Sequence, residues 1–151
     1  MSFGDAGRRP MRLSAMIMLL AIAGGCSSGP EQPVLSGGPG LGCVDDSRHC
    51  IEQRQAALRS LMADRERRWI REPATPAAYA SGVRLFAFKT GKRELTCDEL
   101  ALGRREADAG PGILRGEGGR GLSPAQISRG AMLSGEVAKE LAAEMQKRCK
   151  V

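Results

Sequence analysis

The sequence predicts an all-α fold: a small four-helix domain that carries two disulfides and follows a flexible tether. Three observations support this prediction. Apolar residues recur at helical spacing, two S/T-x-x-E/Q capping signatures stand before apolar stripes, and the cysteines of the second part are even in number. A chain of 151 residues suits one domain, and its 42% apolar content excludes a wholly disordered protein.

The first 25 residues are typical of an export signal. Arg8, Arg9 and Arg12 make a positive beginning, and a short apolar run over 13–23 follows. Eleven residues are too few to span a bilayer as a helix, but they suit the apolar core of a signal peptide. Met11 is an alternative start, because the chain from Met11 already holds a complete signal.

Small residues stand directly before the first cysteine, in the motif Ala23-Gly24-Gly25-Cys26. In this motif the chain resembles a bacterial lipoprotein precursor. The resemblance covers about 26 residues, and it implies cleavage before Cys26 and acylation of that cysteine, with palmitate-like chains that hold the protein on a membrane. Ser27 follows in place of Asp, which in enterobacterial lipoproteins implies the outer membrane. The alternative is a buried apolar helix that ends at Gly24-Gly25.

The chain is therefore divided into three parts. Residues 1–25 are the signal peptide, and residues 26–42 are the lipidated cysteine and a linker rich in Gly, Ser and Pro. Residues 43–151 form the helical domain. As a flexible coil, the linker has an r.m.s. reach of roughly 20–25 Å.

Four cysteines remain after Cys26: Cys43, Cys50, Cys97 and Cys149. In an exported domain they predict two disulfides, with three connectivities open. We favour Cys43–Cys50, a local pair, and Cys97–Cys149, which joins the start of one helix to the end of a later one. A metal site with His49 is disfavoured by the spacing, and a redox role lacks a CxxC pair. We expect no metal and no cofactor.

The first predicted helix covers 46–71. Its apolar stripe is formed by Ile51, Leu58, Leu61, Met62, Trp69 and Ile70, and arginines and acids decorate the remainder. The second covers 76–89 and begins with Thr75 as N-cap and Pro76 at the first helical position. The alternation over 83–88 leaves a β-hairpin over 83–97 as an alternative.

Capping boxes begin the last two helices. Thr96 with Glu99 begins a helix over 97–108, and Ser123 with Gln126 begins a helix over 124–149. The Gly-rich stretch 109–121 between them indicates a mobile loop, since no phosphate-binding glycine pattern follows a strand there.

The sequence carries no motif with a specific chemistry. Its single histidine, His49, leaves no Ser/His/Asp set, and Asp98 and Glu99 are explained by helix capping. Residues 123–141 faintly resemble a helix-turn-helix, and the net charge is +6. The export signal argues against nucleic acid as a partner. We expect a protein that is not an enzyme and has no nucleic-acid partner.

These features favour a structural or protein-interaction lipoprotein of the cell envelope, on the periplasmic side of the outer membrane. Its partners are then the membrane, through the lipid, and an envelope protein. The expected interaction surface comprises Arg65, Arg68, Trp69 and Tyr79, although core packing is an alternative for Trp69. A second hypothesis is an inhibitor or regulator of an envelope enzyme, which requires 109–121 to be rigid and to project. An enzyme is a third.

Overall fold

The computed structural model describes residues 40–150. The expected signal peptide, Cys26 and the linker up to residue 39 lie outside the described residues. All described residues fall in one compact unit. Leu41 is fully buried, so the packed chain includes part of the segment that we assigned to the linker.

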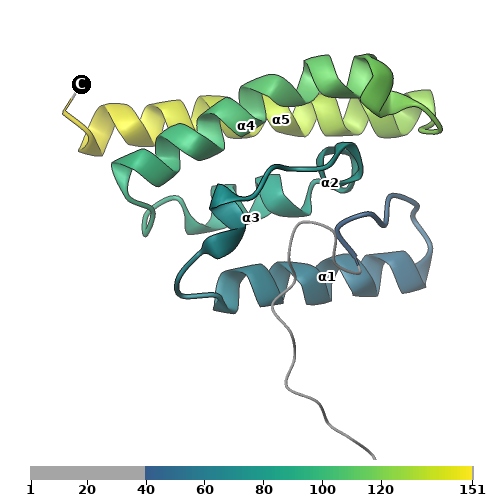
Figure 1. Ribbon diagram of the computed structural model, residues 1–151, viewed down its shortest axis with the longest axis horizontal. Coiled ribbons are helices and arrows are strands. Elements are labelled where there is room, and N and C mark those ends of the chain that lie inside the picture. The colour runs from purple at the N-terminus through teal and green to yellow at the C-terminus, as the bar shows by residue number, and fades with distance from the viewer. Residues whose placement is uncertain (1–39, 151) are drawn as a thin grey trace, which may run out of the picture. The chain divides into compact units, whose positions relative to one another are not determined.

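The all-α prediction is confirmed. Residues 40–150 contain no strand, and their elements are α1 (Arg48–Ala63), η1 (Arg68–Arg71), α2 (Pro76–Ser81), α3 (Val83–Gly91), α4 (Cys97–Arg115), η2 (Glu117–Gly119) and α5 (Pro124–Arg148). Figure 1 shows three layers: the long pair α4 and α5, then the short helices α2 and α3, then α1. The helix α1 is therefore an outer layer of this unit.

The first helix is shorter than predicted. Ser47 caps it by accepting a hydrogen bond from the backbone N–H of Cys50 (3.1 Å). It ends at Ala63, because the Asp64 carboxylate accepts hydrogen bonds from the backbone N–H groups of Glu66 (3.2 Å) and Arg68 (2.9 Å). Such local bonds compete with the helical ladder. The rest of the predicted helix forms only the single turn η1.

One glycine divides the second predicted helix into α2 and α3. Thr75 and Pro76 begin α2 as predicted, and Gly82 ends it with a left-handed φ of 73°. A Cβ at Gly82 would lie 2.6 Å from Leu133 Cδ2, so both the backbone and the packing favour glycine. The alternative hairpin over 83–97 is wrong, because Val83–Gly91 is helical.

The predicted loop over 109–121 is mostly helix. Both capping boxes are present as predicted, but α4 continues through Pro111 to Arg115. Helix packing outweighs the poor helix propensity of this stretch. A Cβ at Gly110 would lie 2.3 Å from Ser134 Oγ on α5, and Leu114 is fully buried. The glycine permits the close approach of the two helices that buries the leucine.

The disulfides have the favoured connectivity, Cys43–Cys50 and Cys97–Cys149. Cys97 is the first residue of α4 and Cys149 is the C-cap of α5, so this bond ties the ends of the antiparallel pair. The main core lies between the layers and includes Leu61, Trp69, Leu85, Phe88, Leu100 and Leu141. Trp69 and Phe88 pack edge to face with ring centroids 4.8 Å apart.

Candidate functional site

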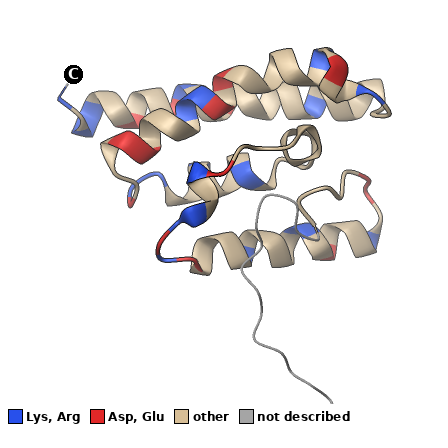
Figure 2. Ribbon diagram, in the orientation of Figure 1, with Lys and Arg blue, Asp and Glu red and all other residues tan. Residues whose placement is uncertain are grey.

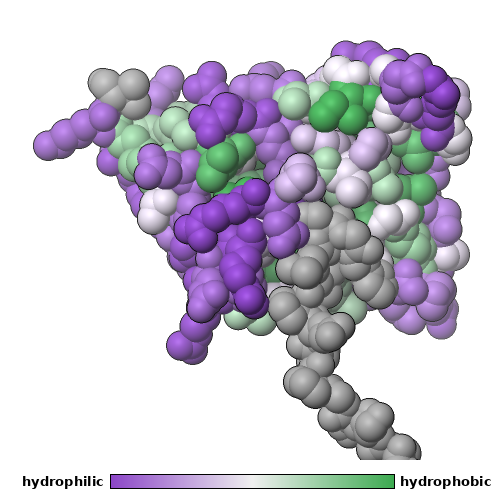
Figure 3. Space-filling view, in the orientation of Figure 1, coloured by the Kyte–Doolittle hydropathy of each residue, from purple (hydrophilic) through white to green (hydrophobic). Residues whose placement is uncertain are grey.

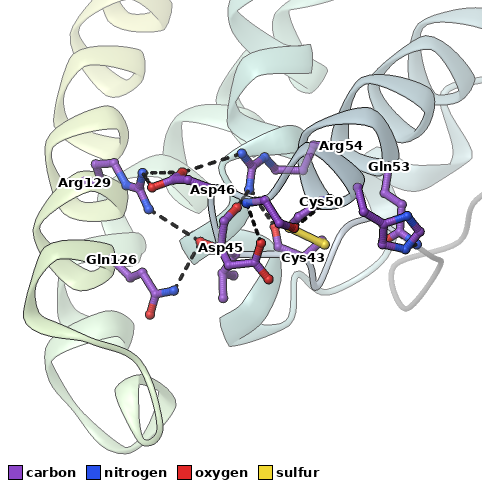
Figure 4. The surroundings of a disulfide bond; sticks show 11 residues. Cys43, Asp45, Asp46, Cys50, Gln53, Arg54, Gln126 and Arg129 are labelled. Atoms are coloured by element: carbon purple, nitrogen blue, oxygen red, sulfur yellow. Dashed lines mark hydrogen bonds and ion pairs between the residues drawn. A yellow bond between two sulfur atoms is a disulfide. The ribbon is translucent and has the colours of Figure 1, made fainter.

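The local disulfide holds the segment before α1 in a tight turn (Figure 4). The Arg54 guanidinium donates to the carbonyl oxygens of Cys43 (3.2 Å) and Asp45 (2.6 Å). The Asp45 carboxylate accepts from the backbone N–H of Ser47 (2.8 Å), and hydrogen bonding from Ser47 lowers the pKa of Asp45. These bonds fix the turn before the helix begins.

Two side chains of α5 attach to this turn from the other side. Figure 4 shows Arg129 and Gln126 reaching across from α5. Arg129 binds both carboxylate oxygens of Asp46 (2.8 and 2.9 Å), and Gln126 Nε2 donates to the carbonyl oxygen of Val44 (3.2 Å). The turn thus links the start of α1 to α5.

The same turn brings together three residues of types that can bind a metal ion: Cys43, Asp45 and Cys50. Both sulfurs are joined in the disulfide and are not thiolates, so only the Asp45 carboxylate keeps ligand character. His49 lies on the exposed side of the first turn of α1, with Nε2 2.9 Å from Gln53 Nε2. The arrangement is that of a structural turn.

An apolar groove opens beside this turn. It has a volume of about 200 Å³ and is lined by Ile51, Arg54, Gln55, Leu58, Ser81, Gly82, Val83, Phe86 and Leu133. A second hollow of about 220 Å³ shares four of these residues and extends toward Val44 and Arg129. Ile51 and Phe86 are 38% and 46% exposed, which is unusual for side chains of their size. The groove combines apolar side chains of α1, α3 and α5.

A basic groove of about 700 Å³ lies at the end of α1. It is lined by Ala56, Arg59, Ser60, Ala63, Asp64, Arg65, Glu66 and Arg68. Figure 2 shows basic and acidic residues following one another along the turn after α1, and Figure 3 shows a hydrophilic surface there. Arg65 and Arg68, two members of the expected interaction surface, are exposed and line this groove.

The other two members, Trp69 and Tyr79, are buried, and this part of the expectation is wrong. Trp69 is 4% exposed and its indole Nε1 donates to the carbonyl oxygen of Leu61 (3.2 Å). Tyr79 is 5% exposed and belongs to a second cluster with Ala80 and Leu114. Burial, and then the nearby Glu106 carboxylate, raise the pKa of Tyr79. Both rings stabilise the fold instead of meeting a partner.

Sequence reasoning missed a buried ion pair. Arg84 is 1% exposed, and its Nε and Nη2 lie 2.9 and 2.5 Å from the two carboxylate oxygens of Glu106. The same guanidinium donates to the carbonyl oxygens of Trp69 (2.7 Å) and Glu72 (2.9 Å). The sequence contains one sign of this pair, which is a single arginine inside the apolar stretch 83–88. Both oxygens of the Glu106 carboxylate bind Arg84. We therefore interpret this cluster as structural.

Comparison with known proteins gives no match: no family model, no curated protein and no solved structure matches this chain. Among residues 40–150, no helix has both the length and the apolar character that a membrane crossing requires. The candidate sites are therefore defined by their geometry alone.

Proposed function

We propose that this protein is a lipid-anchored lipoprotein of the cell envelope whose helical domain binds a protein partner on the periplasmic side of the outer membrane. The apolar groove is the observation that carries the binding role. Apolar side chains that remain exposed beside a hollow are typical of protein contacts. The lipobox-like Ala23-Gly24-Gly25-Cys26 supports the anchor, with palmitate-like chains on Cys26.

The two disulfides are consistent with this proposal, since such bonds persist in oxidising compartments. A regulator of an envelope enzyme is the alternative, and it required a rigid, projecting 109–121. The stretch is ordered, but a Cβ at Gly118 would come within 3.0 Å of Pro76 Cβ, so its tip lies against α2. The apolar groove therefore supports the binding role better.

The anchor is tested by the intact mass of the membrane-extracted protein. We expect a chain that begins at Cys26, carries acyl mass and gains about 4 Da on reduction, because two disulfides open. The Cys26→Ser variant should lose the acyl mass and be released from the membrane fraction by high salt, which does not extract a lipid-anchored chain. An unprocessed chain without acyl mass would refute the lipoprotein assignment.

The binding role is tested by placing a photo-crosslinking residue at position 86 in living cells. We expect one defined envelope partner at this position and none from position 105, an exposed site on α4. The Ile51→Asp change should abolish the crosslink from position 86, because it places a charge in the apolar groove. Crosslinks of equal yield from both positions would contradict a specific contact at the groove.

A further inference from the structure

The basic groove offers guanidinium groups that the described chain does not neutralise. Within residues 40–150, Arg59 and Arg65 make no hydrogen bond and no ion pair. Arg68 has only one ion-pair contact, 3.6 Å from Nε to Glu66 Oε2, and both side chains are more than half exposed. Exposed pairs of this kind contribute little and exchange readily for another anion.

The acids of the basic groove are outnumbered by its arginines, since Asp64 and Glu66 stand beside Arg59, Arg65 and Arg68. Both oxygens of Asp64 accept hydrogen bonds from backbone N–H groups of the turn. Ala56, Ser60 and Ala63 are small and leave space between the arginines. The groove thus has room for an anionic group beside the arginines that line it.

The turn that carries Arg65 and Arg68 is held rigidly. Arg67 adopts a left-handed conformation (φ 49°), which is uncommon for a residue other than glycine. Its Nη1 lies 3.0 and 3.2 Å from the two carboxylate oxygens of Glu99, and its Nη2 donates to the carbonyl oxygen of Glu94 (3.3 Å). Arg67 therefore fastens the turn to the start of α4, while its neighbours remain in solvent.

The described chain begins at Gly40, against α1. Gly40 packs on α1: a Cβ there would lie 2.3 Å from the carbonyl oxygen of Gln53 and 3.1 Å from Ala57 Cβ. From Cys26 to Gly40 there are 14 residue steps (40 − 26), which span at most about 50 Å. A lipid on Cys26 would therefore keep the domain within about 50 Å of the membrane surface.

We propose that the basic groove binds the phosphate groups of anionic phospholipid headgroups and so holds α1 against the membrane surface. This inference rests on the proposed anchor at Cys26. Guanidinium groups suit phosphate because they form paired, charge-assisted hydrogen bonds with it. The anchor raises the local concentration of headgroups, so a contact that is weak in isolation becomes occupied.

The test uses the chain from position 26 with Cys26→Ser, which cannot be acylated but retains the whole described unit and both disulfides. Binding is measured by co-sedimentation with vesicles of phosphatidylglycerol and phosphatidylcholine in equal parts, and with vesicles of phosphatidylcholine alone. We expect binding to the anionic vesicles only, and weaker binding at higher salt. The triple change Arg59→Gln, Arg65→Gln and Arg68→Gln should lower the partition coefficient roughly 100-fold.

A matched variant removes the same charge from α4, with Arg104→Gln, Arg105→Gln and Arg115→Gln. It should stay within a few-fold of the parent, because those exposed arginines lie in the opposite layer. Equal losses in both triple variants, equal binding to phosphatidylcholine, or no binding to anionic vesicles would each overturn the proposal. The circular dichroism of both variants shows whether they are folded. A missing acyl group on the native protein would instead refute the anchor and leave the vesicle result unchanged.

Discussion

Arg84 of α3 and Glu106 of α4 form a bidentate ion pair inside the domain, with Nη2 2.5 Å from Oε2 and Nε 2.9 Å from Oε1. The guanidinium also lies 5.5 Å from the centre of the Trp69 ring. Through the carbonyl oxygens of Trp69 and Glu72, the pair connects the segment after α1 to both helices. One buried side chain thus joins three parts of the chain that are distant in sequence.

The first prediction concerns this ion pair. Glu106→Gln should lower the free energy of unfolding by about 3–5 kcal/mol, because it breaks a buried bidentate ion pair and removes the carboxylate charge opposite Arg84. Glu117→Gln, at an exposed pair with Arg120, should change it by less than about 1 kcal/mol. Urea denaturation measures both. Similar values for the two variants would show that burial does not govern the strength of the pair.

The second prediction compares the disulfides. Replacing Cys97 and Cys149 by Ala should lower the free energy of unfolding by about 4 kcal/mol, and replacing Cys43 and Cys50 by about 2.5 kcal/mol. The longer loop, with a sequence separation of 52 against 7, restricts the unfolded chain more. The denaturant midpoints of the two double variants show which disulfide contributes more to stability. The reverse order would assign the main effect to the folded turn before α1.

The starts of α2, α4 and α5 and the disulfide pairing could be predicted because they depend on local or countable features. Thr75, Thr96 and Ser123 each bond to a backbone N–H three residues away, so the motif is visible in a few letters. The pairing follows from antiparallel helices once their ends are placed. By contrast, the end of α1 depends on which backbone N–H groups bind the Asp64 carboxylate. The spacing of apolar residues does not predict these bonds.

The sites were less predictable because they combine side chains from separate helices. The apolar groove needs Ile51, Phe86 and Leu133, which come from α1, α3 and α5. Trp69 and Tyr79 have amphipathic side chains. Such side chains occur both at contact surfaces and in cores, so the residue type alone does not separate the two. The buried Arg84 is paired with Glu106, which lies 22 residues later in the sequence. Such partners are set by the tertiary arrangement.

The third prediction concerns stability at low pH. Burial raises the pKa of Glu99, but hydrogen bonds from Thr96 and the charge of Arg67 outweigh it, and the pKa lies below its usual 4.5. The pKa of Glu140 is also lowered, by hydrogen bonds from Lys92 and Lys89. A carboxyl with a lowered folded pKa stabilises the fold above the unfolded value, and this contribution is lost as the pH falls through the folded pKa.

Stability should therefore fall as the pH drops below 4.5. Glu99→Gln should flatten this dependence and lower stability at neutral pH, whereas Glu52→Gln, at an exposed position on α1, should leave the slope unchanged. Urea denaturation as a function of pH measures both slopes. If Glu99→Gln keeps the parent slope, then Glu99 is not a source of the acid sensitivity.

The fourth prediction contrasts two glycines. Gly82→Ala should destabilise the domain by about 1–3 kcal/mol, because a left-handed φ of 73° strains an alanine. The new Cβ would also displace Leu133 and so reshape the apolar groove. Gly135→Ala should stabilise the domain by up to about 1 kcal/mol, because Gly135 lies within α5 with no other atom within 4 Å of the new Cβ.

Thermal unfolding distinguishes the two glycine variants by the sign of the change in Tm. The crosslink from position 86 gives an independent measure, which should weaken in Gly82→Ala and persist in Gly135→Ala. If Gly82→Ala keeps the crosslink despite its lower stability, the partner does not contact the part of the apolar groove that Leu133 forms. If both variants lose stability, then α5 is not a continuous helix at Gly135, and the packing of α5 against α4 must differ there.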